Sequence, residues 1–179
     1  LALGCGAVSV TAVEDNPLIV EALQGEYGNF TYGLYTSDRL HLVRQNGRAY
    51  ARQPGHGPFD VVNVALSDPF RPLTSGAYSL TENYTYTTEA FTDALSLLSP
   101  GGLLVVTRWL QAQPGEEARA FGMLAAALER SGLQPSSRLA AFRSMRTVTI
   151  LAGRQPFSAG ELKAFQSFLE ERGFDAVYY

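Results

Sequence analysis

A short apolar run that ends on an acidic residue, directly before a helix start, constrains the fold of this chain more than any other feature. The run is too apolar for a strand with one face in water, so it predicts a strand covered by helices on both faces. Its apolar residues are Val8, Val10, Ala12 and Val13. Asn16 can cap a helix that begins at Pro17, because the first helical residue has no use for the N–H that proline lacks. The run therefore predicts an α/β fold.

Glu14 occupies the carboxyl end of this predicted strand, and Asp15 follows it. In doubly wound sheets, ligands bind outside the carboxyl ends of the strands, where an acidic residue can accept hydrogen bonds from ribose hydroxyls. We therefore predict a nucleoside-type ligand with Glu14 and Asp15 among its contacts. The alternative is that Glu14 is an ordinary acidic residue whose charge interacts with the dipole of the following helix.

Composition excludes several classes of protein. The chain has 179 residues, of which 46% are hydrophobic, and this predicts one domain over residues 1–179. A net charge of -3 without a lysine or arginine cluster argues against a nucleic-acid partner. The single cysteine, Cys5, excludes an internal disulfide and is expected to be a small buried residue. No export signal and no apolar run of about 18 residues is present, so we expect a cytoplasmic location.

Strands and helices alternate along the rest of the chain, which implies parallel pairing and right-handed crossovers. Two late strands are close enough in sequence to pair as an antiparallel hairpin at the sheet edge. A Ser-Ala-Gly-Glu capping box at 158–161 opens the last helix. The predicted strands are 41–43, 59–65, 103–107, 138–142 and 147–151, and the predicted helices are 17–25, 46–52, 87–98, 116–130 and 158–173.

Both ends of the sequence have the character of interrupted elements. The first seven residues, Leu-Ala-Leu-Gly-Cys-Gly-Ala, are typical of a helix that ends at glycine, and residues 175–179 are typical of a strand. We therefore expect a fragment of a longer polypeptide, truncated at the N-terminus.

The order and spacing of several motifs resemble the spermidine synthase-like family, whose fold is that of the class I S-adenosylmethionine-dependent methyltransferases. The resemblance covers residues 1–110 and extends to the last third in topology alone. The Glu-Asn-Tyr-x-Tyr-Thr variant resembles a bacterial subgroup in which this domain is part of a larger, often membrane-attached protein. The motifs are Val-Thr-Ala-Val-Glu-x-Asn-Pro at 10–17, Asn-Gly-Arg at 46–48, Phe-Asp-Val-Val at 59–62, Ser-Asp-Pro at 67–69, Glu-Asn-Tyr-x-Tyr-Thr-x-Glu-Ala-Phe at 82–91 and Pro-Gly-Gly at 100–102.

The resemblance implies a doubly wound, mostly parallel sheet with a C-terminal antiparallel hairpin, and S-adenosylmethionine or its decarboxylated form as cofactor. Family enzymes pass an aminopropyl group to a diamine. Glu14 matches the ribose-binding acid, and the turn of Gly47 and Arg48 lies where the family contacts adenine. Asp68 matches the second aspartate of the Asp-x-x-Asp motif, which anchors the amine, and is the candidate catalytic residue. Tyr84 and Tyr86 are candidate substrate contacts that can close the site by packing on adenine or on a cationic acceptor.

Three departures from the family pattern bear on activity. Ala65 replaces the first aspartate of Asp-x-x-Asp, which activates the amine. Arg48 replaces the adenine-contacting aspartate and has only hydrogen-bond donors to offer. The glycine-rich loop after the family's first strand would precede Leu1 and is absent from this sequence. A domain without that strand lacks the centre of its sheet, so another segment or a homodimer would have to complete it.

These observations leave two main hypotheses. The first is an S-adenosylmethionine-type transferase acting on a small molecule, such as an amine, that is not a true polyamine synthase. The second is a catalytically inactive binding or regulatory domain, which Ala65 and Arg48 favour. A nicotinamide-dependent enzyme is disfavoured, because the chain lacks Gly-x-Gly-x-x-Gly. No metal site is predicted, and any membrane segment is expected to lie outside this chain.

Overall fold

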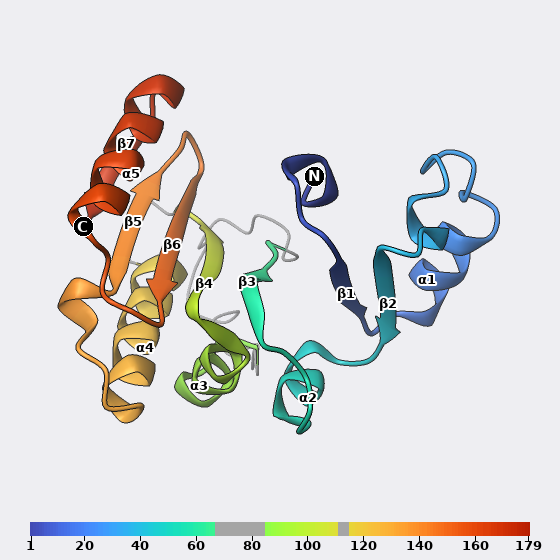
Figure 1. The fold of residues 1–179 in the computed structure, drawn as a ribbon, viewed down its shortest axis with the longest axis horizontal. Helices are drawn as coiled ribbons and strands as arrows, with labels where there is room; N and C mark the ends of the chain where they lie inside the picture. The colour runs from blue at the N-terminus through green and yellow to red at the C-terminus, as the bar shows by residue number, and fades with distance from the viewer. Residues whose placement is uncertain (67–84, 111–114) are drawn as a thin grey trace, which may run out of the picture. The chain divides into compact units, whose positions relative to one another are not determined.

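The computed structural model describes residues 1–66, 85–110 and 115–179. The chain divides into two compact units, Leu1–Pro54 and Gly55–Tyr179. In Figure 1, residue number is shown by colour, from blue at the N-terminus to red at the C-terminus. The prediction of a single domain over residues 1–179 stays a prediction.

The first unit is built on two parallel strands joined by a helix. The side chain of Asn16 accepts a hydrogen bond from the backbone N–H of Leu18 at 3.0 Å, and Pro17 is the first helical residue, so the predicted helix start is confirmed. Cys5 is exposed, and the prediction of a buried thiol is wrong because the short 3-10 helix that carries it has no buried residue. The elements are η1 (Leu3–Cys5), β1 (Val10–Glu14), α1 (Pro17–Gln24), η2 (Leu34–Thr36), β2 (Leu40–Arg44) and α2 (Gly47–Arg52).

The second unit contains a five-stranded mixed sheet in the order β3-β4-β6-β5-β7. Strands β3 and β4 are parallel, and the remaining neighbours are antiparallel. The α/β class is therefore confirmed, whereas the expectation of a mostly parallel sheet is wrong for this five-stranded sheet, because β6, β5 and β7 all join it by antiparallel pairing. The elements are β3 (Phe59–Val64), α3 (Thr88–Ser96), β4 (Leu98–Trp109), α4 (Glu116–Arg130), η3 (Pro135–Ser137), β5 (Leu139–Arg143), β6 (Thr147–Gly153), α5 (Ala159–Arg172) and β7 (Asp175–Tyr178).

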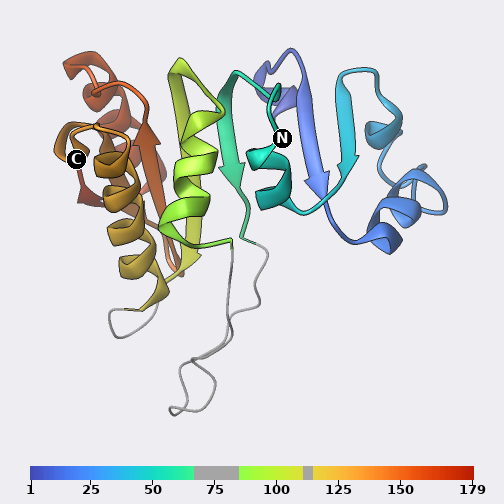
Figure 2. The same ribbon diagram turned by 90° about the horizontal axis from the view of Figure 1, so that it is seen from below.

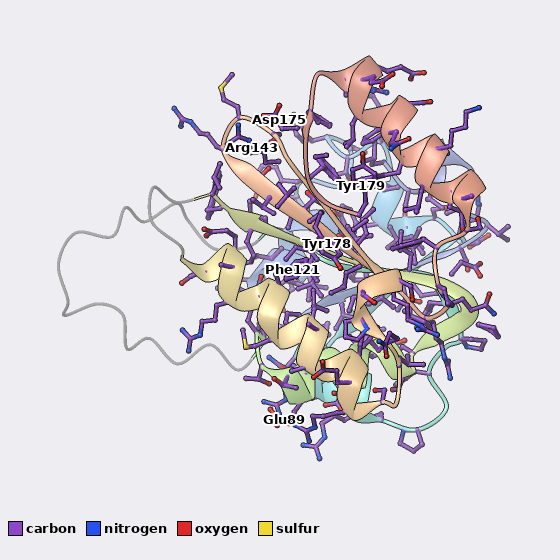
Figure 3. The ribbon with its side chains drawn as sticks, turned by 90° about the vertical axis from the view of Figure 1, so that its left-hand side faces the viewer. Glu89, Phe121, Arg143, Asp175, Tyr178 and Tyr179 are labelled. Carbon is purple, nitrogen blue, oxygen red and sulfur yellow. The ribbon has the colours of Figure 1, made fainter. Side chains whose placement is uncertain are left out.

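The predicted hairpin of β5 and β6 is present, but its position at the sheet edge is wrong. Strand β6 pairs with β4, and the last strand, β7, pairs with the other side of β5. Figure 3 shows this edge, where the guanidinium of Arg143 bonds to the carboxylate of Asp175 at 2.9 Å and the rings of Phe121 and Tyr178 meet edge to face at 5.2 Å. The edge position therefore belongs to β7.

Helices α3 and α4 cover one face of the five-stranded sheet, as Figure 2 shows from below. Alternate side chains of β4 point into this core because successive side chains of a strand face opposite sides. Leu104 and Val106 are fully buried there, together with Leu124 of α4. On the opposite face, the ring of Phe142 stacks on Phe174 at 5.3 Å and meets rings of α5 edge to face.

The junction between α3 and β4 differs from the prediction. Helix α3 ends at Ser96, and Leu98, predicted as its last apolar residue, is the fully buried first residue of β4. Residues 99–102, which follow the predicted helix, therefore belong to β4. A Cβ atom on Gly102 would lie 2.8 Å from the carbonyl oxygen of Phe59, so the absence of a side chain lets β4 approach β3 closely.

Helix α5 begins with the predicted capping box. The hydroxyl of Ser158 accepts the backbone N–H of Glu161 at 3.2 Å, and the carboxylate of Glu161 accepts the backbone N–H of Ser158 at 2.8 Å. Hydrogen bonds from the Ser158 side chain first, and from its backbone second, hold the pKa of the Glu161 carboxyl below its ordinary value. The helix ends at Arg172 and is followed by the predicted stop, Gly173, whose φ of 64° lies in the left-handed region.

We predict that Glu161→Gln makes stability less dependent on acid pH. A carboxyl whose pKa is lower in the folded chain stabilises it above the unfolded pKa of about 4.3, and this contribution is lost as pH falls through the folded pKa. Urea unfolding between about pH 6 and pH 3 should therefore show a steeper loss of stability for the natural chain than for Glu161→Gln. Glu170→Gln, in the same helix, is the charge-matched control. Parallel pH profiles for the natural chain and Glu161→Gln would contradict this prediction.

Candidate functional site

The carboxyl ends of β1 and β2 lie side by side in the first unit. Glu14 is opposite Arg44 in the parallel register, and the backbone N–H of Gln45 donates to the carbonyl oxygen of Glu14 at 3.1 Å. Parallel pairing places the residues that follow both strands at the same edge. This is the edge at which open α/β sheets bind ligands.

Glu14 lies half-buried at this edge. Its Oε1 atom accepts the backbone N–H of Asn16 at 2.8 Å, directly before helix α1. The alternative interpretation, in which Glu14 serves the start of the helix, therefore has a hydrogen bond in its favour. Within the described part of the chain, no other hydrogen bond to this carboxylate is present. Its Oε2 atom thus has the capacity to accept a further hydrogen bond.

Asn46 joins the two strand ends. Its side-chain oxygen accepts the backbone N–H groups of Arg48 and Ala49 at 3.1 and 3.3 Å, which caps α2. Its side-chain nitrogen lies 3.5 Å from the carboxylate of Asp15, at the outer limit of a hydrogen bond. The sequence analysis placed Asn46 in the Asn-Gly-Arg motif and not among the site residues, although asparagine directly before a short helix is an N-cap signal.

The structure brings four predicted cofactor contacts, Glu14, Asp15, Gly47 and Arg48, to this one edge. Gly47 opens α2, and a Cβ atom built on it meets nothing within 4 Å. Neither packing nor a left-handed backbone therefore requires glycine at this position. Arg48 is half-buried, in the first turn of the helix. We call the edge formed by these four residues and Asn46 the strand-end site.

The predicted substrate contacts belong to the second unit. Asp68 and Tyr84 lie outside the described residues. Tyr86 is half-buried, just before the helix cap Thr87, and its ring meets Phe91 edge to face at 6.3 Å. The guanidinium carbon of Arg108 lies 3.9 Å from the centroid of the Tyr86 ring. A ligand contact by Tyr86 stays a prediction.

Arg108 is a residue that sequence reasoning missed. It is 2% exposed, near the carboxyl end of β4, and forms an ion pair with the carboxylate of Glu116, the first residue of α4. The sequence signal that could have found it is the alternation of side chains along a strand. Residue 108 is two positions after Val106 and four after Leu104, so its side chain is expected on the same, buried face. A buried cation at that point of the pattern requires partners.

Helices α3 and α4 are also joined by an ion pair on the protein surface. Arg130 of α4 bonds to Glu89 of α3 at 2.6 Å, and this hydrogen bond is the largest cause that lowers the pKa of the Glu89 carboxyl. Both side chains are more than half exposed, so we assign the pair a small contribution to stability. A cavity of 390 Å³ lies elsewhere in this unit, against β3, β4 and α5, and none of the predicted site residues that the structure describes lines it.

Two further findings concern residues 1–66, 85–110 and 115–179. In these ranges, histidine, cysteine, aspartate and glutamate side chains form no group of three or more that is arranged to hold a metal ion. The same ranges contain no helix with the length and apolar character needed to cross a membrane.

Comparison with known proteins relates the chain to polyamine aminopropyltransferases. No family model matches the sequence. Polyamine aminopropyltransferases of Mycobacterium tuberculosis and Mycobacterium bovis are 30% identical to it over 103 residues, which are 56% of this chain and 18% of theirs. The chain is thus a distant homologue that matches a small part of these larger proteins.

Solved structures show the same fold. Spermidine synthase from Thermotoga maritima matches 86% of this chain and 48% of its own length, with 18% identity and a TM-score of 0.54. A probable spermidine synthase from Corynebacterium glutamicum matches 94% of this chain and 56% of its own, with 19% identity and a TM-score of 0.60. The chain therefore has the Rossmann-like fold of spermidine synthases, which is a methyltransferase-like fold.

We predict that Asn46→Ala loosens the start of α2. The change removes the acceptor for two backbone N–H groups, a loss that costs about 1 kcal/mol at a helix N-cap. Amide exchange of Arg48 and Ala49 should accelerate about fivefold when followed by NMR. Asn46→Asp keeps the acceptor and should retain most of the protection. Asn29→Ala, at an exposed position of the same unit, is the control; equal exchange in the natural chain and Asn46→Ala would contradict the assignment.

Proposed function

We propose that this chain is an S-adenosylmethionine-type nucleoside-binding transferase domain, which transfers a methyl or aminopropyl group and is not a true spermidine synthase. The observation that carries the proposal is the strand-end site, where Glu14 retains an oxygen able to accept a hydrogen bond. The distant homology to polyamine aminopropyltransferases supports the same class of ligand.

The residues at the strand-end site fit the nucleoside part of such a cofactor. In the proposal, Glu14 accepts hydrogen bonds from the ribose hydroxyls, and its half-burial reduces the competition from water. The open space at Gly47 lets the ligand approach the backbone there. When bound, the cofactor supplies an electrophilic carbon next to a positively charged sulfur, and the chain has to hold this group and exclude water.

The acceptor side of the reaction rests on the predicted substrate contacts. An amine attacks carbon in its unprotonated form, so a carboxylate must orient it and receive its proton. We assign this role to Asp68, with Tyr84 and Tyr86 as neighbouring contacts. Ala65 has no side chain that can act as a base, which is the reason to separate this chain from true spermidine synthases.

A second candidate function is that of a catalytically inactive domain that binds the nucleoside as a binding or regulatory module. Ala65 and Arg48 favour it, since one removes a base and the other replaces an acceptor with donors. The two candidates differ in turnover. An active transferase consumes S-adenosylmethionine or its decarboxylated form in the presence of a diamine, whereas the inactive domain binds the cofactor and leaves it intact.

We predict that Glu14→Gln weakens cofactor binding. The change keeps the size of the side chain and removes its charge, and hydrogen bonds to a charged group are stronger than those to a neutral one by an amount that corresponds to about tenfold in affinity. Isothermal titration calorimetry with S-adenosylmethionine and with its decarboxylated form measures the dissociation constants. Glu26→Gln, in the same unit, is the charge-matched control and should bind as the natural chain does.

Two results would contradict the proposed function. One is the absence of binding of either nucleoside to the natural chain at millimolar ligand. The other is equal affinity of the natural chain and Glu14→Gln, which would leave Glu14 with its local role at the start of α1 alone.

We predict that Gly47→Ala leaves the stability of the chain equal or greater and weakens ligand binding. The new methyl group meets no atom of the chain, and alanine is favoured over glycine in a helix by about 1 kcal/mol, so urea unfolding should show equal or greater stability. If the ligand packs against this position, the same methyl group should weaken binding of S-adenosylmethionine in calorimetry. Unchanged affinity in a stable Gly47→Ala chain would exclude close approach of the ligand at Gly47.

A further inference from the structure

Arg108 connects the starts of two helices in the second unit. Its guanidinium carbon lies 3.9 Å from the ring centroid of Tyr86, which directly precedes the cap of α3. The same guanidinium pairs with the carboxylate of Glu116, the first residue of α4. Arg108 itself is part of β4 and is 2% exposed. We call Arg108, Tyr86 and Glu116 the Arg108 clamp.

The two contacts of the Arg108 clamp depend on the shape and charge of the arginine side chain. A guanidinium is planar and always charged, so it stacks on an aromatic face while its edge pairs with a carboxylate. A cation taken out of water at this depth is stable only with such partners. The ring of Tyr86 is held from a second side by Phe91 of α3, which is 1% exposed and meets it edge to face at 6.3 Å.

We propose that Arg108 is a positioning residue that fixes the ring of Tyr86 and the first turn of α4 at the carboxyl end of β4. The ring of Tyr86 is then held in place at that end of the sheet and does not move to close over an acceptor. The inference rests on the proposed function insofar as that proposal makes Tyr86 a contact of the acceptor.

The exposed pair between Arg130 and Glu89 provides a matched control. It also joins α4 to α3, by a hydrogen bond of 2.6 Å, but its side chains are 56% and 53% exposed. Arg130→Met and Arg108→Met therefore remove the same chemical group from links between the same two helices. The two variants differ in burial and in the aromatic ring.

Hydrogen exchange followed by mass spectrometry on the 179-residue chain tests the coupling. Arg108→Met should accelerate exchange about tenfold in peptides that cover 87–91 and 116–120, while β6 stays protected. Arg130→Met should stay within about twofold of the natural chain in the same peptides. Arg108→Lys keeps the charge without the planar group, so exchange in these peptides should be as fast as in Arg108→Met. Tyr86→Phe keeps the ring, so exchange should be as slow as in the natural chain.

The proposal fails if Arg108→Met and Arg130→Met have equal effects, or if Arg108→Met accelerates exchange equally in all parts of the second unit. Should Arg108→Met not fold, Tyr86→Leu removes the ring alone and should accelerate exchange at 87–91. Unchanged exchange in Tyr86→Leu would also overturn the proposal.

Exchange in the presence of a diamine, 1,4-diaminobutane, tests the proposed contact of Tyr86 with the acceptor. The diamine should slow exchange at 87–91 in the natural chain, and Arg108→Lys should lose this effect. Unchanged exchange at 87–91 on addition of the diamine would overturn the role of Tyr86 as an acceptor contact. Cofactor binding is measured separately by calorimetry, and the ligand-free comparison of Arg108→Met with Arg130→Met still decides whether Arg108 couples the two helices.

Discussion

Parallel pairing of β1 with β2 is the constraint on which the strand-end site depends. Two parallel strands cannot be joined by a tight turn, so the chain must cross back through α1 before it enters β2. The crossover leaves both carboxyl ends at one edge, and this is why Asp15 and Asn46, 31 positions apart in the chain, come within 3.5 Å. The polar residues there act together because the backbone topology brings them together.

Features that depend on a few neighbouring residues could be predicted from the sequence. The start of α1 at Pro17 and the capping box at Ser158 involve residues two or three positions apart, so the local pattern contains all the necessary information. The strand-end position of Glu14 followed from the same kind of pattern. In each of these cases, the side chain and the backbone group that it serves belong to the same turn.

Features that depend on distant partners could not be predicted in this way. Leu98 has helical spacing from α3, yet it belongs to β4, because pairing with Phe59 across the sheet outweighs the local period. The hairpin is not at the predicted sheet edge, because β7 pairs with β5. The sequence of one strand alone does not show which other strand it pairs with. Arg108 has partners at positions 86 and 116, so its burial becomes evident once the fold is known.

Binding and chemistry place different demands on this fold. In the proposed function, nucleoside binding needs one acceptor at a strand end, and we assign this role to one oxygen of Glu14 while the other accepts the backbone N–H of Asn16 at the helix start. Group transfer needs in addition a base beside the acceptor, and Ala65 removes one of the two carboxylates that the family pattern provides. Loss of a base does not disturb the hydrogen bonds at the end of β1. Under the proposed function, affinity for the cofactor is therefore independent of whether the acceptor changes or turnover is lost.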